Sequence, residues 1–406
     1  MSDMNFAPHP DFLPPEEMHT AMRTPAEKLQ DIIKSLNAPQ RAAVEKIDGP
    51  LLVLAGAGTG KTRVLTTRLA HILLSGRAQP HNIMAVTFTN KAAKEMKTRV
   101  EELVGGSAAG MWLGTFHSIG SRILRMHPEV AGLQPNFNII DSDDQKRICQ
   151  EILQEFNIDT TRIPPRMVVG VLSRFKDNAL TPKDLSAEDA TQLDGAAKKI
   201  YTAYQNRLEA LNVVDFGDLL LKPLLILKAR SDLLTRYQEQ LKYVLVDEYQ
   251  DTNAVQYLWL RLLTMAHKNI CVVGDDDQSI YGWRGAKVEN ILRFEKDYDA
   301  AEVVRLEQNY RSTGTILEAA SSVISHNKTR HGKELWTADK AGDLIEVHPV
   351  MSDLDEARLV ADRAQQAPNH NQPYSDYAVL VRTAAQTRTF EEAFIKAGLP
   401  LSLIHI

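Results

Sequence analysis

The hydrophobic pattern predicts alternating strands and helices in the first part of the chain. The apolar run at 51–55 predicts a short buried strand, and the residues after it have the apolar spacing of a helix. A second apolar run at 83–90 and a helical pattern at 91–103 repeat this order, and a third strand is predicted at 111–116. Such repeats predict a parallel sheet with right-handed crossovers, in which ligands bind at the carboxyl ends of the strands.

The pattern from 141 to about 240 is helical, and no convincing strand interrupts it. Ser142 and Gln145 have the spacing of a capping box, which predicts a helix start. Longer helices are predicted at 187–211 and 215–229. We therefore expect an all-α insertion within the α/β sheet.

Strands are predicted again at 242–248, at 270–274 and from 303, where the strand turns into a loop. A second series of strands and helices starts near 308. Its strands are predicted at 343–350 and 376–382. Its helices are predicted at 313–327, 353–366 and 384–397.

Composition indicates a soluble globular protein. The 406 residues are enough for about two to four domains. No apolar run approaches the ~18–20 residues of a membrane span, and the polar, proline-bearing N-terminus predicts a disordered lead-in without a signal core. Cys149 and Cys271 are far apart and form no CxxC pair. We expect buried thiols in a reducing compartment, the cytoplasm.

The net charge of −5 argues against binding of nucleic acid through the overall charge of the protein. Any DNA site must be a local groove of cations and aromatic platforms. Four cations of the helical stretch could contribute to it, but we favour a solvated face for them: Arg162, Arg166, Arg174 and Lys176.

A glycine-rich turn joins the strand at 51–55 to the following helix. It predicts a phosphate-binding loop, because backbone N–H groups and a helix N-terminus there point at an anion. Lys61 would reach the β- and γ-phosphates, and the Thr62 hydroxyl would hold Mg²⁺. The loop comprises Ala55, Gly56, Ala57, Gly58, Thr59 and Gly60. An ordinary glycine turn is the alternative, and Ala55 departs from the usual initial glycine.

Two carboxylates end the strand at 242–248. Asp247 would bind Mg²⁺, and Glu248 would polarise a water aimed at the γ-phosphate. Such a pair is common by chance, but it is significant together with a phosphate loop. Upstream, Asn37 could cap a helix that starts near Pro39. Gln40 would lie on its first turn, where an exposed glutamine is the alternative.

Aromatic residues at strand ends are candidates for stacking on bases. Phe88 stands at the end of the strand at 83–90, where it could be a stacking platform or a core residue. The loop at 275–286 contains Tyr281, Trp283 and Arg284, which suit stacking and phosphate contact. A hydrophobic plug is the alternative for Trp283, and its polar neighbours argue against it.

Taken together, the motifs resemble those of the UvrD/Rep/PcrA superfamily 1 DNA helicases. The resemblance covers about 36–399 and rests on the motifs LNAPQ, AGAGTGKTR, AVTFTNKAAKEM, GTFHSIG, VDFGDLL, VLVDEYQDTN, VVGDDDQSIYGWRGA and LEQNYRS, which occur in one order. Ala55 looks like the family's own variant. The resemblance implies a RecA-like P-loop NTPase lobe with an all-α insertion, followed by an incomplete second RecA-like lobe.

The resemblance implies roles for single residues in ATP binding and hydrolysis. Gln40 resembles the adenine-reading glutamine, and Arg63 and Tyr310 resemble the pair that sandwiches the adenine. Gln278 resembles the γ-phosphate sensor, and Arg311 the first arginine finger. The matched catalytic positions are Lys61, Asp247, Glu248, Gln278 and Arg311, and Thr62 and Asp247 match the Mg²⁺ ligands. The positions matching contacts to single-stranded DNA are Phe88, Asn90, His117, Tyr281, Trp283 and Arg284.

The resemblance also implies domain boundaries. Lobe 1A is expected at 25–116 and 241–307, insertion 1B at 117–240, and lobe 2A at 308–406, after a lead-in at 1–24. The family continues with a second helical insertion and a second arginine finger, and LSLIHI fits the expected strand poorly. We therefore expect a truncated or frame-broken product, which would bind Mg²⁺-ATP weakly and unwind nothing.

The function implied is a 3′-to-5′ ATP-dependent DNA helicase that acts on single-stranded DNA and 3′-tailed duplexes, in DNA repair or replication. One alternative is an ATPase that does not touch DNA, which leaves the TFTN and YGWRGA loops unexplained. A second is a non-unwinding fragment that binds ATP and single-stranded DNA. A third is the helicase part of a helicase–nuclease.

Overall fold

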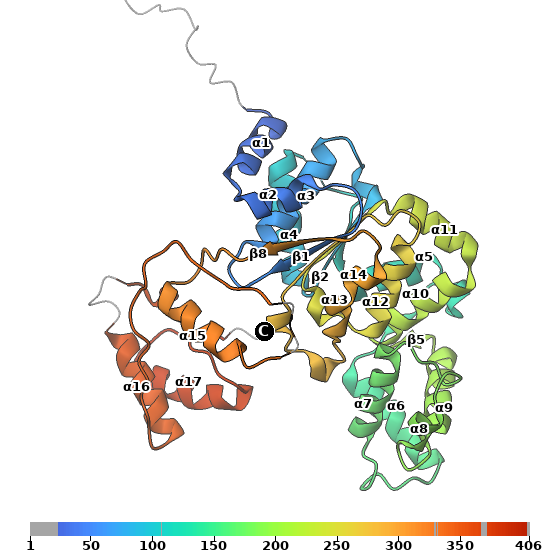
Figure 1. The fold of residues 1–406 in the computed structure, drawn as a ribbon. Helices are drawn as coiled ribbons and strands as arrows, with labels where there is room; N and C mark the ends of the chain where they lie inside the picture. Colours follow the sequence, from blue (N-terminus) through green and yellow to red (C-terminus); the bar gives the residue numbers. More distant parts are fainter. Residues whose placement is uncertain (1–22, 107, 329, 331, 367–371, 404–406) are drawn as a thin grey trace, which may run out of the picture. The chain divides into compact units, whose positions relative to one another are not determined.

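The structure is a computed structural model with two compact units, which meet in sequence at Gly342 and Asp343. Each unit is described by itself. The described residues are 23–106, 108–328, 330, 332–366 and 372–403 (Figure 1). The lead-in expected at 1–24 lies almost wholly outside them, as do the last residues of LSLIHI.

A six-stranded parallel sheet forms the centre of the first unit, in the order β3-β2-β6-β7-β1-β8. Its strands are β1 Leu51–Ala55, β2 Ile83–Thr87, β3 Trp112–Thr115, β6 Tyr243–Val246, β7 Ile270–Gly274 and β8 Glu302–Leu306. Leu52 lies opposite both Val272 of β7 and Val303 of β8. The parallel sheet predicted from the strand–helix repeats is confirmed. Because all strands are parallel, the loops that follow β1, β6 and β7 meet at one edge.

Helices cover both faces of this sheet. The helices on one face are α1 Pro25–Ser35, α2 Ala38–Glu45, α3 Lys61–Leu74 and α4 Asn90–Val104. Those on the other face are α5 Phe116–Met126, α10 Asp218–Ala229, α11 Ser231–Gln240, α12 Ala254–Thr264, α13 Glu289–Leu292 and α14 Phe294–Asp297. Helix α15, Gly314–Ile324, follows β8 in the chain.

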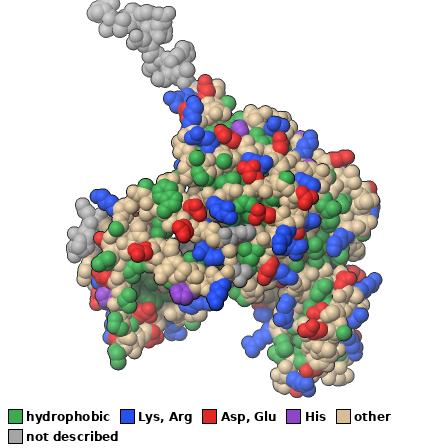
Figure 2. Space-filling model, viewed as in Figure 1, with side chains coloured by type: hydrophobic (Ala, Val, Ile, Leu, Met, Phe, Trp, Pro, Cys, Tyr) green, Lys and Arg blue, Asp and Glu red, His purple; other side chains and the backbone are tan. Residues whose placement is uncertain are grey.

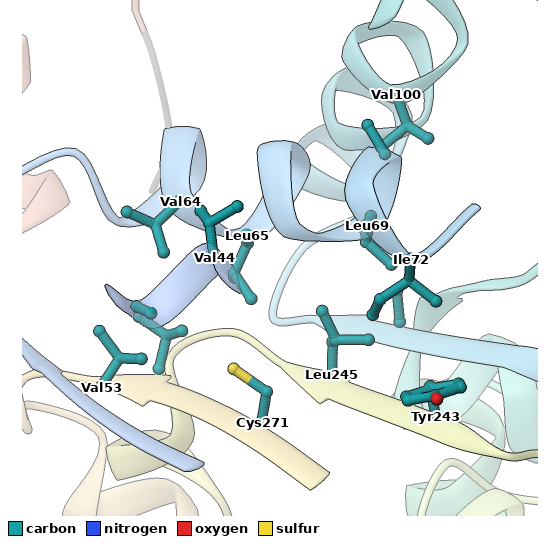
Figure 3. Packing of buried hydrophobic residues seen from close by; sticks show 14 of the residues in the cluster. Val44, Val53, Val64, Leu65, Leu69, Ile72, Val100, Tyr243, Leu245 and Cys271 are labelled. Carbon is teal, nitrogen blue, oxygen red and sulfur yellow. The ribbon is translucent and has the colours of Figure 1, made fainter. Parts of the chain in front are cut away.

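The strands are continuous apolar runs because each side of the sheet has its own core. Val53 of β1 packs into the core beneath α3, and Leu52 and Leu54 pack into the core on the opposite face. Figure 3 shows Leu69 and Ile72 of α3 lying over strand residues of the first core. Full burial of one such side chain contributes about 1.5–3 kcal/mol, so both faces hold the sheet in place.

The helical insertion contains α6 Ser142–Glu155, α7 Pro165–Asp177, α8 Ala187–Thr191 and α9 Ala197–Ala210. Helices α6, α7 and α9 pack around a core of their own, to which α8 contributes no buried side chain. The prediction of a single helix at 187–211 was wrong. Leu193 and Asp194 have left-handed φ angles of 53° and 56° and separate α8 from α9. The stretch is also not purely helical, because β5 Val213–Val214 pairs in parallel with β4 Asn138–Ile139.

The first helix of the insertion starts differently from the prediction. Asp141, not Ser142, is its N-cap, and the Asp141 carboxylate accepts the N–H groups of Asp143 and Asp144. Both residue types cap well. The aspartate accepts two N–H groups at once, which leaves Ser142 as the first helical residue. The predicted cap at Asn37 is confirmed, with α2 starting at Ala38.

Lys176 was predicted to lie on a solvated face, and this was wrong. Its side chain is 1% exposed, and its ammonium lies 2.7 Å from Asp215 and 2.8 Å from Asp218. Tyr204 donates a third hydrogen bond into this cluster, to Asp215 at 2.9 Å. A buried ammonium needs such partners because an unpaired charge is very costly in the interior.

The second unit contains two packed helices, α16 Asp353–Gln365 and α17 Thr387–Lys396, whose contact buries Ala357 and Phe390. The strands predicted at 343–350 and 376–382 are absent from the described residues. Their apolar side chains are exposed, Leu344 at 85% and Leu380 at 88%. A strand exists only with a ladder partner, and neither segment has one among the described residues.

The surface and the thiols agree with the composition. Figure 2 shows acidic and basic side chains interspersed over the visible face. Cys149 and Cys271 are both buried and neither forms a disulfide, as predicted. Within the part of the chain that the structure describes, no helix has the length and apolarity needed to cross a membrane.

Candidate functional site

The glycine-rich turn after β1 forms a compact loop against the N-terminus of α3. Gly60 caps α3 with a left-handed φ of 87°, which an L side chain rarely adopts. Thr59 is fully buried, and its hydroxyl donates to the Gly56 carbonyl at 2.8 Å. Lys61 and Thr62 are the first two residues of α3. The loop thus presents free helix N–H groups of the kind that bind phosphate.

Lys61 and Glu248 are joined across the sheet edge. The Lys61 ammonium lies 3.1 Å from a carboxylate oxygen of Glu248. Glu248 has a left-handed backbone with φ of 50°, which costs a non-glycine residue about 1–2 kcal/mol. Its N–H donates to the Asp247 carboxylate at 3.0 Å, which helps to stabilise this conformation. The structure therefore brings two predicted catalytic residues into direct contact.

Asp247 lies beside this pair in a half-buried position. Burial raises the pKa of Asp247 to about 7, and the neighbouring charge of Glu248 adds to the rise. Burial likewise raises the pKa of Asp251 to about 7, again with a contribution from Glu248. A divalent cation would favour the ionised carboxylates. Asp247 and the Thr62 hydroxyl are hard oxygen donors, so the residues present fit Mg²⁺.

Gln250 connects the loop after β6 to the loop after β7. Its side chain is buried, its amide N–H donates to Glu248 at 2.9 Å, and its amide oxygen accepts the Asp275 N–H at 2.9 Å. Gln278 in turn donates its side-chain amide to the Asp275 carboxylate. The sequence analysis missed Gln250, although it lies in the motif VLVDEYQDTN. Its burial depends on Asp275, a hydrogen-bond partner in the loop after a different strand, β7.

The residues after β8 lie against the phosphate loop. Asn309 donates its amide to the Ala57 carbonyl at 2.6 Å, and the Tyr310 N–H donates to the Gly58 carbonyl at 2.9 Å. The Asn309 side-chain oxygen also accepts the Arg311 N–H at 2.8 Å. A Cβ at Gly58 would lie 2.6 Å from the Asn309 amide, so glycine is required for this approach. The sequence analysis did not select Asn309.

Gln40 is buried rather than exposed, so the alternative of an exposed glutamine was wrong. Its side-chain amide donates to the Thr59 carbonyl at 2.9 Å. Asn37 caps the same helix and donates to the Tyr310 hydroxyl at 2.9 Å. Arg63 donates to the Ser35 hydroxyl at 2.8 Å. Gln40 and Tyr310 therefore both contact the glycine-rich loop, and each is hydrogen-bonded to Asn37.

An aromatic surface lies on the loops after β2 and β7. The rings of Phe88 and Tyr281 are 4.7 Å apart, and those of Tyr281 and Trp283 are 6.4 Å apart. The Arg284 guanidinium lies 4.5 Å from the centre of the Trp283 ring. Trp283 is 75% exposed and Phe88 is 37% exposed. Neither is a core residue, so the core and plug alternatives were wrong.

His117 and Asn90 lie near the starts of helices. His117 is in the first turn of α5, where burial lowers the pKa of its imidazole. Its ring packs edge-on against Phe216 at 5.8 Å, and Phe216 is 52% exposed. Asn90 is exposed at the first position of α4. Phe216 was not selected from the sequence, although the motif VDFGDLL contains it.

Two family models match the chain. The UvrD/REP helicase N-terminal domain matches residues 36–299. The UvrD-like helicase C-terminal domain matches residues 304–405. Together these matches cover the helical insertion, nearly all of the second unit and the parallel sheet apart from the first two residues of β8.

Curated relatives match most of this chain. A probable DNA helicase II homolog from Rickettsia conorii is 51% identical over 379 residues, which are 92% of this chain and 58% of the relative. An ATP-dependent DNA helicase PcrA from Staphylococcus epidermidis is 46% identical over 373 residues, which are 92% of this chain and 51% of the relative. The chain therefore spans little more than half the length of these relatives.

Proposed function

The chain belongs to the UvrD/REP helicase family, and we propose that it is an ATP-dependent DNA helicase that moves 3′ to 5′ along single-stranded DNA. One observation carries this proposal. The loop after β7 contains both Gln278, which is linked through Asp275 and Gln250 to Glu248, and the exposed aromatic residue Trp283. A single loop thus joins a nucleotide site to a surface suited to stacking on bases.

The nucleotide is ATP with Mg²⁺, held at the loop after β1. Lys61 and the N–H groups of the glycine turn bind the β- and γ-phosphates. Thr62 and Asp247 hold Mg²⁺, which neutralises charge on the phosphates. The adenine lies between Arg63 and Tyr310. Gln40 reads its edge, and the loop itself comprises Ala55, Gly56, Ala57, Gly58, Thr59 and Gly60.

Hydrolysis requires a base and positive charge at the γ-phosphate. Glu248 accepts the proton of the attacking water, and Arg311 stabilises the developing charge as an arginine finger. Gln278 senses the γ-phosphate. The contact of Lys61 with Glu248 supports this assignment, because a phosphate bound by Lys61 would lie within reach of a water held by Glu248.

Single-stranded DNA binds along the aromatic surface. Phe88, Tyr281 and Trp283 offer π-faces to bases, and Arg284 offers a cation to phosphate. Asn90 and His117 extend the contact, and the exposed ring of Phe216 beside His117 adds a further aromatic surface. Stacking of this kind is tolerant of base sequence.

The domain assignment follows the family. Lobe 1A comprises 25–116 and 241–307, insertion 1B comprises 117–240, and lobe 2A starts at 308. The protein acts on single-stranded DNA and 3′-tailed duplexes in DNA repair or replication. Its buried, unpaired thiols suit the reducing cytoplasm.

The test is ATP hydrolysis with and without oligo-dT, followed by strand separation on 3′-tailed and 5′-tailed duplexes. We expect DNA to stimulate hydrolysis, and any strand separation to be confined to the duplex with a 3′ tail. Lys61→Ala serves as the inactive control. An equal rate of hydrolysis with and without oligo-dT would favour an ATPase that does not bind DNA. Binding of ATP and DNA without separation would favour the non-unwinding fragment.

A further inference from the structure

Lys333 is buried among three consecutive carboxylates. Its ammonium lies 2.7 Å from Asp275, 2.6 Å from Asp276 and 2.8 Å from Asp277. Its side chain is 2% exposed, and it comes from the segment between α15 and the end of the first unit. Arg330 of the same segment lies 2.7 Å from Asp277. Lys333 is thus the common partner of the whole acidic triplet.

The triplet depends on this ammonium for electrostatic reasons. Carboxylate oxygens of the three aspartates all lie within 4.8 Å of one another. Like charges this close repel one another strongly, and burial removes the water that would screen them. The ammonium of Lys333 occupies the position between the oxygens that would otherwise suit a cation. Without it, the loop would have to open or take up protons.

The same loop connects to the proposed catalytic residues. Asp275 uses one carboxylate oxygen for Lys333 and the other for the side-chain amide of Gln278. The Asp275 N–H donates to Gln250, and Gln250 donates to Glu248. A continuous chain of polar contacts therefore runs from Lys333 to the carboxylate that pairs with Lys61.

We propose that Lys333 is a positioning residue for hydrolysis: its ammonium gathers the triplet Asp275, Asp276 and Asp277 and thereby places Gln278 and, through Gln250, Glu248. The proposal rests on the proposed ATP hydrolysis and adds a residue that touches neither nucleotide nor DNA. It predicts a specific defect. Nucleotide still binds, because Lys61, Tyr310 and the glycine loop are unchanged, but turnover falls.

The first experiment needs no nucleotide. Hydrogen exchange with mass spectrometry is compared for peptides covering 247–251 and 275–286 in wild type, Lys333→Met and Lys333→Arg. We expect faster exchange in both peptides for Lys333→Met and at least partial restoration by Lys333→Arg. Lys340→Met, at an exposed position of the same segment, is the matched control. Unchanged exchange in Lys333→Met would overturn the proposal.

The second experiment separates binding from turnover. We expect Lys333→Met to lower kcat for ATP roughly tenfold, within the range for residues that modulate coupling without touching a ligand. The affinity for a fluorescent ATP analogue should change less than about threefold by the same reasoning. A parallel loss of affinity and kcat, or no loss of kcat, would contradict a positioning role.

Charge compensation distinguishes positioning from general destabilisation. Asp276→Asn removes one carboxylate of the triplet, so the double variant with Lys333→Met should recover part of the lost kcat. Added ethylammonium should likewise restore turnover in Lys333→Ala by replacing the missing ammonium. Simple unfolding would respond to neither, and thermal unfolding of each variant checks this directly. Failure of both rescues would overturn the proposal.

The two proposals fail in different ways. If wild type neither binds nor hydrolyses ATP, the proposed function is refuted, while hydrogen exchange still decides whether Lys333 orders the loops. If wild type hydrolyses ATP and Lys333→Met does so equally well, the proposed function stands and the role of Lys333 is refuted.

Discussion

The Lys61 ammonium lies 3.1 Å from a carboxylate oxygen of Glu248, so the loops that follow β1 and β6 are joined by a charge pair. In the proposed mechanism both groups act on the same γ-phosphate. The phosphate must therefore compete with Glu248 for Lys61. Gln250, which donates to the same carboxylate oxygen, can keep Glu248 in place when Lys61 turns to the nucleotide.

The first prediction concerns this pair. Glu248→Gln should retain ATP binding and lose turnover, because an amide cannot act as the base and no longer attracts Lys61. Lys61→Ala should lose hydrolysis together with most of the nucleotide affinity, because the charge that holds the phosphates is gone. Nucleotide affinity and steady-state hydrolysis are measured on both variants. Normal turnover in Glu248→Gln would disprove the role of the carboxylate.

The second prediction concerns the aromatic surface. Trp283→Ala and Phe88→Ala should each weaken binding of single-stranded DNA by ~1–3 kcal/mol, the usual contribution of one base stack. The loss should be similar for oligo-dT and a mixed sequence in fluorescence anisotropy. Leu211→Ala is the control, since Leu211 is 55% exposed but lies on the insertion, outside the proposed DNA surface. Folded aromatic variants that bind DNA like wild type would refute the assignment.

The third prediction concerns the link between Asn37 and Tyr310. Asn37→Ser keeps a capping hydroxyl for α2 but removes the amide that donates to the Tyr310 hydroxyl. We expect ATP affinity to fall by about 0.5–1.5 kcal/mol, the net value of one hydrogen bond. Tyr310→Phe should cause a similar loss, and the double variant should lose little more. Additive losses would show that the two residues act separately.

The fourth prediction concerns pH. Burial raises the pKa of Asp177 to about 6, although Asn253 donates to its carboxylate at 2.8 Å. The unfolded value is about 3.9, so the folded state binds the extra proton and stability falls as pH rises from about 4 to 6. Asp177→Asn removes this titration. It should raise the free energy of unfolding by about 1–3 kcal/mol at pH 7.5 and by little at pH 4.

Urea unfolding of wild type and Asp177→Asn at the two pH values provides the comparison. Only the difference between the two proteins is interpreted, because other carboxylates titrate in both. A gain of equal size at pH 7.5 and pH 4 would show that the effect comes from packing or from the contact with Asn253, and not from the buried charge.

The sequence was sufficient to predict those features that depend on residues close together in the chain. Apolar runs predicted the central strands, and the glycine pattern with Lys61 located the loop after β1. Asn37 was predicted as a cap because a cap involves only the next three residues. The exposed positions of Phe88 and Trp283 were left open, since the spacing of single aromatic residues does not distinguish surface from core.

Features that depend on distant partners could not be predicted. Lys176 and Lys333 are charged residues, for which exposure is the ordinary expectation. Their burial depends on distant carboxylates. Lys176 contacts Asp215, which is 39 positions away, and Lys333 contacts Asp276, which is 57 positions away. The strand predicted at 376–382 failed for the same reason, because a strand requires a ladder partner that its own sequence does not specify.

The place of β1 between β7 and β8 has a consequence for synthesis on the ribosome. Both neighbours of Leu51–Ala55 are made more than 200 residues after it, since β7 starts at Ile270 and β8 at Glu302. At about 5–20 residues per second, the nascent strand waits roughly 10–40 seconds with both edges unpaired. During that time its apolar residues are exposed to other chains. The strand order therefore leads us to expect that the nascent chain needs chaperones during translation.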